Sequence, residues 1–247
     1  MLRVLLILIT FQLATSSSQA DEINPLWFGV EITDYSPYYY MDEGQRYKGA
    51  ARDIFDLFSN SMNTTAHYQA MPVRRLFNEF FEGNIDLKFP DNPLWSVDLK
   101  GDTTVFYSKP VFSVRESLLI LEQAEGEIAA KDIEKVGTIL GFTVPGIANN
   151  LSNNEFEAIR IKKIEQLIHM LVSKRIQAVY FNENVALSVA KDMYPNKNLK
   201  RHSKFPAFKY AYHLSSIKHP QLIKKFNQFL NSHAEKITKI KHHYGLK

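Results

Sequence analysis

The stretch from Met71 to Glu122 constrains the fold more than any other part of the chain. It begins with a predicted helix, because apolar residues recur at helical spacing, Pro72 suits a first turn and Gly83 can form a left-handed cap. A buried strand and an irregular loop follow. After Pro110, which excludes a helix, the apolar run from Ser117 to Leu121 predicts a second buried strand. This order predicts two lobes that are joined by crossing strands.

The first twenty residues have the pattern of an export signal. Arg3 precedes an apolar run that is too short to cross a bilayer as a helix. Ser18 and Ala20 supply the small residues of a cleavage site. We therefore predict that residues 1–20 are a signal peptide that is removed after export, and an uncleaved anchor is the alternative.

The chain contains no cysteine, so it can form no disulfide and carries no thiol for a lipid anchor. An unanchored exported protein is retained only by an outer membrane, which predicts a Gram-negative periplasm. The net charge of +4 is too small to indicate nucleic-acid binding. The sequence has no phosphate-binding loop, nucleophile motif or metal-binding spacing, so we expect neither a cofactor nor a metal.

Several short motifs occur in a characteristic order along the chain. They are Ser36-Pro37-Tyr38, Lys48-Gly49, Gly83 to Asp86, Tyr107 to Pro110, Asp132-Ile133, Val136-Gly137, Gly141 to Thr143, Tyr210 to Leu214 and His243 to Gly245. In this order they resemble the extracytoplasmic solute-binding proteins of family 3, the amino-acid-type binding proteins of ABC importers. The resemblance covers nearly all of the chain that follows the export signal.

The resemblance implies an α/β fold of two lobes, the periplasmic binding protein type II fold. Each lobe would be a mixed, mostly parallel sheet flanked by helices, and two hinge strands would join them. Lobe 1 would comprise residues 21–116 plus 207–247, and lobe 2 residues 117–206. Bending is expected at about Val111 to Glu116 and Pro206 to Lys209.

The function that the resemblance implies is binding without chemistry. A monomer would close over a small polar ligand, amino-acid-like and carrying a carboxylate, and would present it to an ABC permease. One alternative is an orphan ligand sensor that is read by a membrane receptor. Another is a dehydratase-like enzyme on the same fold, for which Glu183 and Asp91 are the residues to test.

The sequence departs from the family at both positions that would hold an amino-acid ligand, one for its carboxylate and one for its ammonium group. Family members hold the ligand carboxylate with an arginine in the loop before the hinge, but the loop that begins at Asn92 has none. They hold the ammonium with an acid after a lobe 2 strand, where this chain has Asn182 followed by Glu183. Arg75 matches the arginine of a second group of family-like proteins and could pair an anion, although a surface arginine is an equal alternative.

The remaining candidates are aromatic residues and a turn. Tyr35, Tyr38 and Trp95 are candidate walls of the ligand site, because aromatic faces stack on planar or cationic groups. Simple loop packing is the alternative for Trp95. The turn Gly141-Phe142-Thr143 leads into a predicted helix, whose free N–H groups would favour an anion, and a capping threonine is the alternative there.

Overall fold

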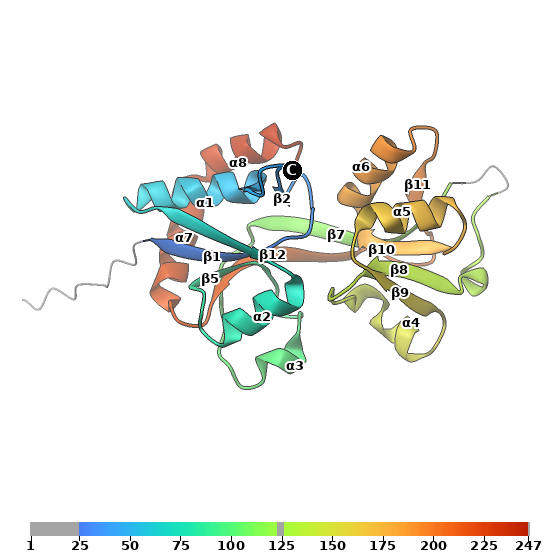
Figure 1. Ribbon diagram of the computed structural model, residues 1–247, viewed down its shortest axis with the longest axis horizontal. Helices are drawn as coiled ribbons and strands as arrows, with labels where there is room; N and C mark the ends of the chain where they lie inside the picture. Colours follow the sequence, from blue (N-terminus) through green and yellow to red (C-terminus); the bar gives the residue numbers. More distant parts are fainter. Residues whose placement is uncertain (1–24, 123–125, 247) are drawn as a thin grey trace, which may run out of the picture.

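Two lobes joined by two long strands make up the molecule, as the sequence predicts (Figure 1). The computed structural model describes residues 25–122 and 126–246. The predicted signal peptide, residues 1–20, lies outside the described residues. Within the described part of the chain, no helix has both the length and the apolar character that a membrane span requires.

Lobe 1 is built on a parallel core of three strands with the order β4-β1-β5, and strand β12 pairs antiparallel with β5 (Figure 1). The strands of this lobe are β1 (Leu26–Glu31), β2 (Tyr40–Met41), β3 (Tyr47–Lys48), β4 (Ala66–Met71), β5 (Leu87–Asp91) and β6 (Phe106–Tyr107). Its helices are α1 (Ala50–Ser61), α2 (Val73–Phe81), α3 (Val97–Lys100), α7 (Pro220–Ser232) and α8 (Ala234–His243). The predicted helix after Met71 is thus confirmed as α2, and Gly83 has a φ of 79° just after it.

Lobe 2 repeats this plan with a parallel β10-β8-β9 core. Its strands are β8 (Lys135–Ile139), β9 (Glu157–Ile161), β10 (Ala178–Asn182) and β11 (Leu199–Arg201). Its helices are α4 (Ala148–Ser152), α5 (Ile164–Val172) and α6 (Glu183–Met193), with short 3-10 turns η1 (Ala130–Asp132) and η2 (Pro145–Ile147). Helices lie on both sides of each sheet, as expected for parallel strands that need both faces covered (Figure 1).

The strands that run between the lobes are β7 (Phe112–Leu121) and β12 (Phe208–Ser216). They pair antiparallel from Phe208 opposite Glu116 to Tyr212 opposite Phe112. The strand predicted from Ser117 to Leu121 is confirmed as the second half of β7. The predicted lobe boundary after residue 116 falls inside β7, and the one after residue 206 falls just before β12. These boundaries stay predictions, as does bending at the two hinge segments.

Gly29 in the middle of β1 allows α2 to lie close to the sheet. A β-carbon at this position would lie 2.2 Å from Ile85 Cδ1 and 2.8 Å from Leu76 Cδ1. Both neighbours are fully buried in the small cluster beneath α2. The absence of a side chain at Gly29 therefore sets the position of α2, which carries two residues of the site described below.

We predict that Gly29→Ala lowers the free energy of unfolding by about 1–3 kcal/mol, because the methyl group overpacks this cluster. Gly44→Ala is the matched control, since Gly44 lies in an exposed turn and its added carbon meets nothing closer than 3.3 Å. Urea denaturation of the two variants measures the difference. Equal stabilities would show that α2 can shift without cost.

Candidate ligand site between the lobes

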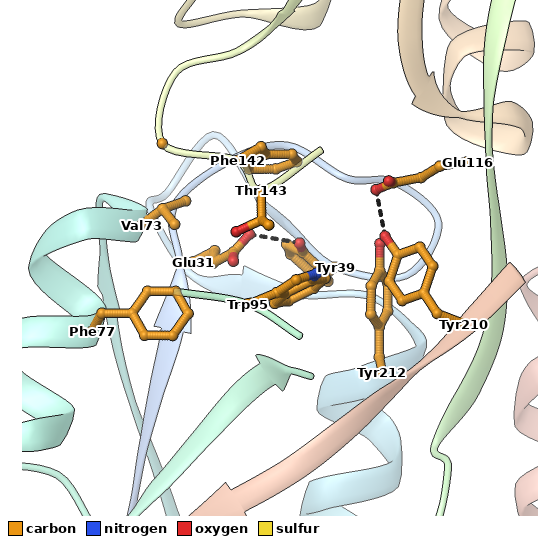
Figure 2. Close-up of a pocket in the computed structure, with 11 residues that line it drawn as sticks. Glu31, Tyr39, Val73, Phe77, Trp95, Glu116, Phe142, Thr143, Tyr210 and Tyr212 are labelled. Carbon is orange, nitrogen blue, oxygen red and sulfur yellow. Dashed lines mark hydrogen bonds between the residues drawn. The ribbon is translucent and has the colours of Figure 1, made fainter. Parts of the chain in front are cut away.

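A cavity of about 20 Å³ lies between the lobes, next to the crossing strands (Figure 2). Its walls come from lobe 1, from lobe 2 and from β7 and β12. The lining residues are Glu31, Tyr39, Val73, Phe77, Trp95, Glu116, Gly141, Phe142, Thr143, Tyr210 and Tyr212. A space of this size holds roughly one water molecule, so side chains fill most of the site.

The ends of the parallel strands place several of these residues. Glu31 is the last residue of β1, and Gly141 follows shortly after β8. Ligands of open α/β sheets bind outside the carboxyl ends of the strands, and the cavity lies where these ends of the two lobes face each other. Val73 and Phe77 reach it from the first turns of α2.

Glu31 is an acid in an almost dry environment, with 2% of its surface exposed. The Tyr39 hydroxyl donates a hydrogen bond of 2.7 Å to Glu31 Oε2. Burial raises the pKa of Glu31 to about 7, although the charge of Lys88 and the Tyr39 hydrogen bond lower it. Near neutral pH this carboxyl group therefore exists in both protonation states.

Lys88 and Asp91 form a buried ion pair close to Glu31. The Lys88 Nζ lies 3.2 Å from Asp91 Oδ1 and donates a 2.8 Å hydrogen bond to the carbonyl oxygen of Pro90. The Ser215 hydroxyl donates to Asp91 Oδ2 at 2.6 Å. Burial lowers the pKa of Lys88, but the charges of Asp91 and Glu31 oppose this shift. The ammonium group is thus already satisfied by Asp91, and neither residue lines the cavity.

Glu116 is the second acid of the cavity and lies on β7, with 4% of its surface exposed. The Tyr210 hydroxyl donates a hydrogen bond to Glu116 Oε1 (Figure 2). Burial raises the pKa of Glu116 to about 7, against the lowering effect of the hydroxyls of Tyr210 and Tyr180. Glu116 Oε2 has no hydrogen-bond partner of good geometry among the described residues, so the Tyr180 hydroxyl is near the carboxyl group without satisfying this oxygen.

Aromatic rings form most of the remaining wall. The Trp95 ring lies 5.8 Å from the Tyr210 ring and 5.6 Å from the Tyr212 ring, both in edge-on contact. Phe142 from lobe 2 stacks on Phe181 with 5.9 Å between the ring centroids. Trp95 and Phe142 are only partly buried and belong to loops, so they are the wall residues with the most freedom to move.

Four of the ten predicted site residues line the cavity. They are Trp95, Gly141, Phe142 and Thr143. Tyr35 packs directly behind the wall, fully buried, with its ring 5.3 Å from Tyr39 and 5.9 Å from Phe142. Its position supports the wall of the cavity.

Tyr38, Asn92, Asn182 and Glu183 lie outside the cavity. Tyr38 lines a separate open groove beside the hinge strands. Asn92 donates to the carbonyl oxygen of Ala211 at 2.8 Å, which ties its loop to β12. Asn182 caps α6 by accepting a 3.3 Å hydrogen bond from Val185 N.

Glu183 is held by ion pairs. Its Oε2 lies 2.6 Å from Arg115 Nε, and its Oε1 lies 3.7 Å from Arg201 Nη1. The Ser117 hydroxyl also donates to Oε1. These partners on β7 and β11 leave the carboxylate engaged rather than directed at the cavity.

Arg75 does not line the cavity, so its predicted role stays a prediction that this arrangement does not favour. Its side chain is 68% exposed and lies 3.3 Å from Glu79, one helical turn away. Val73 and Phe77 face the cavity, and a residue midway between them is rotated by about 200° around the helix. The packing of α2 therefore turns Arg75 towards solvent.

The predicted anion site after Gly141 stays a prediction, with fewer free N–H groups than the sequence suggests. Helix α4 has only five residues, and η2 precedes it. Pro145 has no N–H group, the Gly146 N–H donates to the Tyr180 hydroxyl at 3.1 Å, and the Ile147 N–H donates to Val144 O. The N–H groups of Phe142, Gly146 and Ile147 are therefore occupied, whereas those of Thr143 and Val144 have no hydrogen-bond partner within residues 25–122 and 126–246.

Seven residues of the cavity were not predicted. They are Glu31, Tyr39, Val73, Phe77, Glu116, Tyr210 and Tyr212. Glu31 carries a usable signal, because it is an acid at the end of an apolar strand. Glu116 carries none, since it stands in a run of polar residues before the apolar part of β7. No cluster of three or more metal-ligating side chains occurs in residues 25–122 and 126–246.

The bacterial extracellular solute-binding proteins, family 3, have a sequence model that matches residues 26–247. This chain belongs to that family. The fold is accordingly the periplasmic binding protein type II fold, and solved structures agree with it. No curated protein sequence matches the chain significantly.

Three of the similar solved structures share this fold at low sequence identity. An ancestral arginine-binding protein bound to arginine is 18% identical and aligns over 90% of this chain and 98% of its own, with a TM-score of 0.72. An arginine transport-system periplasmic binding protein from Legionella pneumophila is 15% identical over 90% of this chain and 100% of its own, with a TM-score of 0.71. A histidine kinase sensor domain is 12% identical over 89% and 95%, with a TM-score of 0.72.

The raised pKa values of Glu31 and Glu116 predict that stability falls as pH rises. Each group has a pKa of about 7 in the folded protein, against an ordinary value of 4.5 for a glutamate side chain. The folded state therefore holds protons that the unfolded chain has lost. The stabilisation that these protons give is complete below pH 4.5 and is lost as pH rises through about 7. Between these values the free energy of unfolding falls by about 1.4 kcal/mol per pH unit for each group.

We predict that the stability of Glu116→Gln relative to the original protein increases by about 1–3 kcal/mol between about pH 5 and about pH 8, because the amide cannot ionise. The quantity compared is the free energy of unfolding of each protein. Denaturant unfolding at several pH values measures this difference. Glu134→Gln, at an exposed position, is the control and should follow the original protein throughout. Parallel pH curves for Glu116→Gln and the original protein would contradict the raised pKa.

Proposed function

We propose that this protein is a periplasmic solute-binding protein that closes over a small polar ligand and catalyses no reaction. The observation that carries the proposal is the composition of the cavity wall, which includes residues from both lobes and from both crossing strands. A ligand that contacts both lobes stabilises the closed form over the open one. An ABC-type importer would then receive the ligand from the closed form.

Lobe 1 contacts lobe 2 through the Tyr35 ring, which lies 5.9 Å from the Phe142 ring and 5.0 Å from the Phe181 ring, and through two long hydrogen bonds. Ser96 N donates to Thr143 Oγ1 at 3.5 Å, and Asn184 Nδ2 donates to the Tyr38 hydroxyl at 3.5 Å. Both distances are at the long limit for a hydrogen bond, so each contributes little. We infer that the ligand adds to the free energy that favours closure, and that bending occurs in β7 and just before β12.

Membership of the family does not decide which membrane protein reads the closed form. A sensor role, in which a membrane receptor replaces the importer, is the nearest alternative, and the similar fold of a histidine kinase sensor domain supports its consideration. Either role needs the same ligand-dependent closure.

A dehydratase-like enzyme is the second candidate, and a specific observation favours it. Glu31 and Glu116 have pKa values of about 7 within an enclosed cavity, a property that suits general acids and bases. Glu183 and Asp91, the residues expected for this role, are instead held in ion pairs outside the cavity wall. An enzymatic function would therefore rest on the two cavity acids.

The two tryptophans of the chain allow a direct test of binding. Trp95 lines the cavity, whereas Trp27 lies on β1 with 38% of its surface exposed. We predict that Trp27→Phe, which retains Trp95, shows a saturable fluorescence change with a ligand. Trp95→Phe, which retains Trp27, should show almost none. The panel comprises amino acids, short peptides, organic acids and polyamines.

Small-angle X-ray scattering of the same samples should show a smaller radius of gyration with the ligand than without it. Incubation followed by NMR of the small molecule distinguishes binding from turnover, because a binding protein returns the compound unchanged. A folded protein that gives neither a fluorescence change nor compaction with any compound would contradict the proposed function.

A further inference from the structure

The charge of the cavity wall is entirely negative. Of the eleven lining residues, the ionisable side chains that carry charge near neutral pH are Glu31 and Glu116, and none is lysine, arginine or histidine. Lys88 approaches from behind Phe77, with its Nζ 3.8 Å from the centre of that ring, but its charge is paired with Asp91. A ligand that enters the cavity therefore meets two acids and no cation.

Glu116 is the less satisfied of these acids. Within residues 25–122 and 126–246, no lysine, arginine or histidine lies within ion-pair distance of its carboxyl group, and Oε2 lacks a hydrogen-bond partner, although the nearby Tyr180 hydroxyl lowers the pKa of the group. An unpaired acceptor in a buried site is unfavourable until a donor reaches it. The missing partner is thus a group that brings an N–H or O–H donor, and one with positive charge compensates best.

Glu31 presents a second carboxyl group on another side of the cavity, beside Tyr39 (Figure 2). The groups that act on its charge are Lys88, Asp91 and the Tyr39 hydroxyl. Lys88 offsets Glu31 only from a distance, because it is bonded to Asp91 and to the Pro90 carbonyl group. Two acids therefore remain with little compensation in one small space.

Aromatic rings complete a site for a cation. Six of the lining residues are aromatic, namely Tyr39, Phe77, Trp95, Phe142, Tyr210 and Tyr212. The faces of such rings attract cations, and the attraction is larger where water is excluded. A carboxylate would find no cationic side chain in the cavity wall, because Arg75 points to solvent, and the N–H groups of Phe142, Gly146 and Ile147 are occupied.

We propose, on the basis of the proposed binding function, that the ligand is an organic amine without a carboxylate, whose ammonium N–H groups bond to Glu31 and Glu116. The unpartnered oxygen of Glu116 requires an N–H donor, which a quaternary ammonium ion does not have. The cavity volume of about 20 Å³ requires that Trp95 and Phe142 move, or that the lobes separate, when the amine enters.

The test uses calorimetric titration of the purified protein with defined probes. Butylamine and putrescine represent the proposed class, choline a cation without N–H donors on nitrogen, arginine a cation with a carboxylate, and glutamate and succinate the acids. We expect butylamine or putrescine to bind at least tenfold more tightly than choline, arginine or the acids. Glu116→Gln and Glu31→Gln should each weaken this binding about tenfold or more, through loss of a charge-assisted hydrogen bond.

The pH dependence separates ligand binding from a merely structural role of the acids. If the ligand-free protein keeps the structure seen here and the amine binds only the ionised carboxylate, a pKa of about 7 for Glu116 means about tenfold tighter binding at pH 8 than at pH 6. Glu116→Gln should lose the part of this dependence that Glu116 supplies. Arg75→Ala, outside the cavity, is the control and should bind like the original protein, and thermal melts confirm that each variant is folded.

The outcomes distinguish failure of the amine inference from failure of the proposed binding function. Tight binding of arginine, glutamate or succinate instead of the amines would overturn the amine inference but would support the binding function. An amine that binds equally well to both glutamine variants would also overturn it. If no probe binds and the fluorescence panel is silent as well, both the inference and the binding function fail.

Discussion

The antiparallel pairing of β7 with β12 is the constraint on which the rest of the molecule depends. These strands carry the chain between the lobes, and their register places Phe208 opposite Glu116. Tyr210 is then the diagonal neighbour of Glu116, within reach of its carboxyl group. A slip of one residue would turn every side chain of a strand to the other face, so the site exists only in this register.

The same arrangement buries acids that a purely structural core would not retain. Burial disfavours an ionised carboxylate, and Glu31 and Glu116 respond with pKa values of about 7. Tyr39 and Tyr210 give each acid one hydrogen bond, which limits the cost without removing it. By contrast, the buried pair of Lys88 and Asp91 satisfies itself internally and serves the structure. The first two residues therefore cost stability that Lys88 and Asp91 do not, which is the pattern expected of a functional site.

Much of the fold could be predicted because its signals are local. The helical spacing after Met71, the cap at Gly83 and the apolar run after Ser117 each depend on a few neighbouring residues. Trp95 and Phe142 could be found for a similar reason, since loops at strand ends face the crevice of an open α/β sheet. The same rule covers Glu31, because it is an acid at the end of an apolar strand. The pattern does not reveal that this acid is buried.

The residues that sequence could not place depend on contacts between distant segments. Glu116 looks like a solvent-facing residue until β12, about ninety residues later in the chain, covers it. The orientation of Arg75 depends on which face of α2 packs on the sheet, and that phase is set by Leu76 and Phe80 in the cluster beneath the helix. A match to a short motif fixes the place of an arginine in the chain, but the packing of its helix decides where the guanidinium group points.

The position of the two acids links ligand charge to closure. In an open form, water would hydrate Glu31 and Glu116, and both would ionise at neutral pH as exposed carboxyl groups do. Closing the lobes removes this water, so an empty closed form must take up protons or leave charge uncompensated. An ammonium ion supplies the opposite charge and the N–H donors at the same point, whereas a neutral or anionic solute does not. Under the amine proposal, the closed form is therefore favoured by the ligand that carries the missing charge, and selectivity and closure depend on the same two side chains.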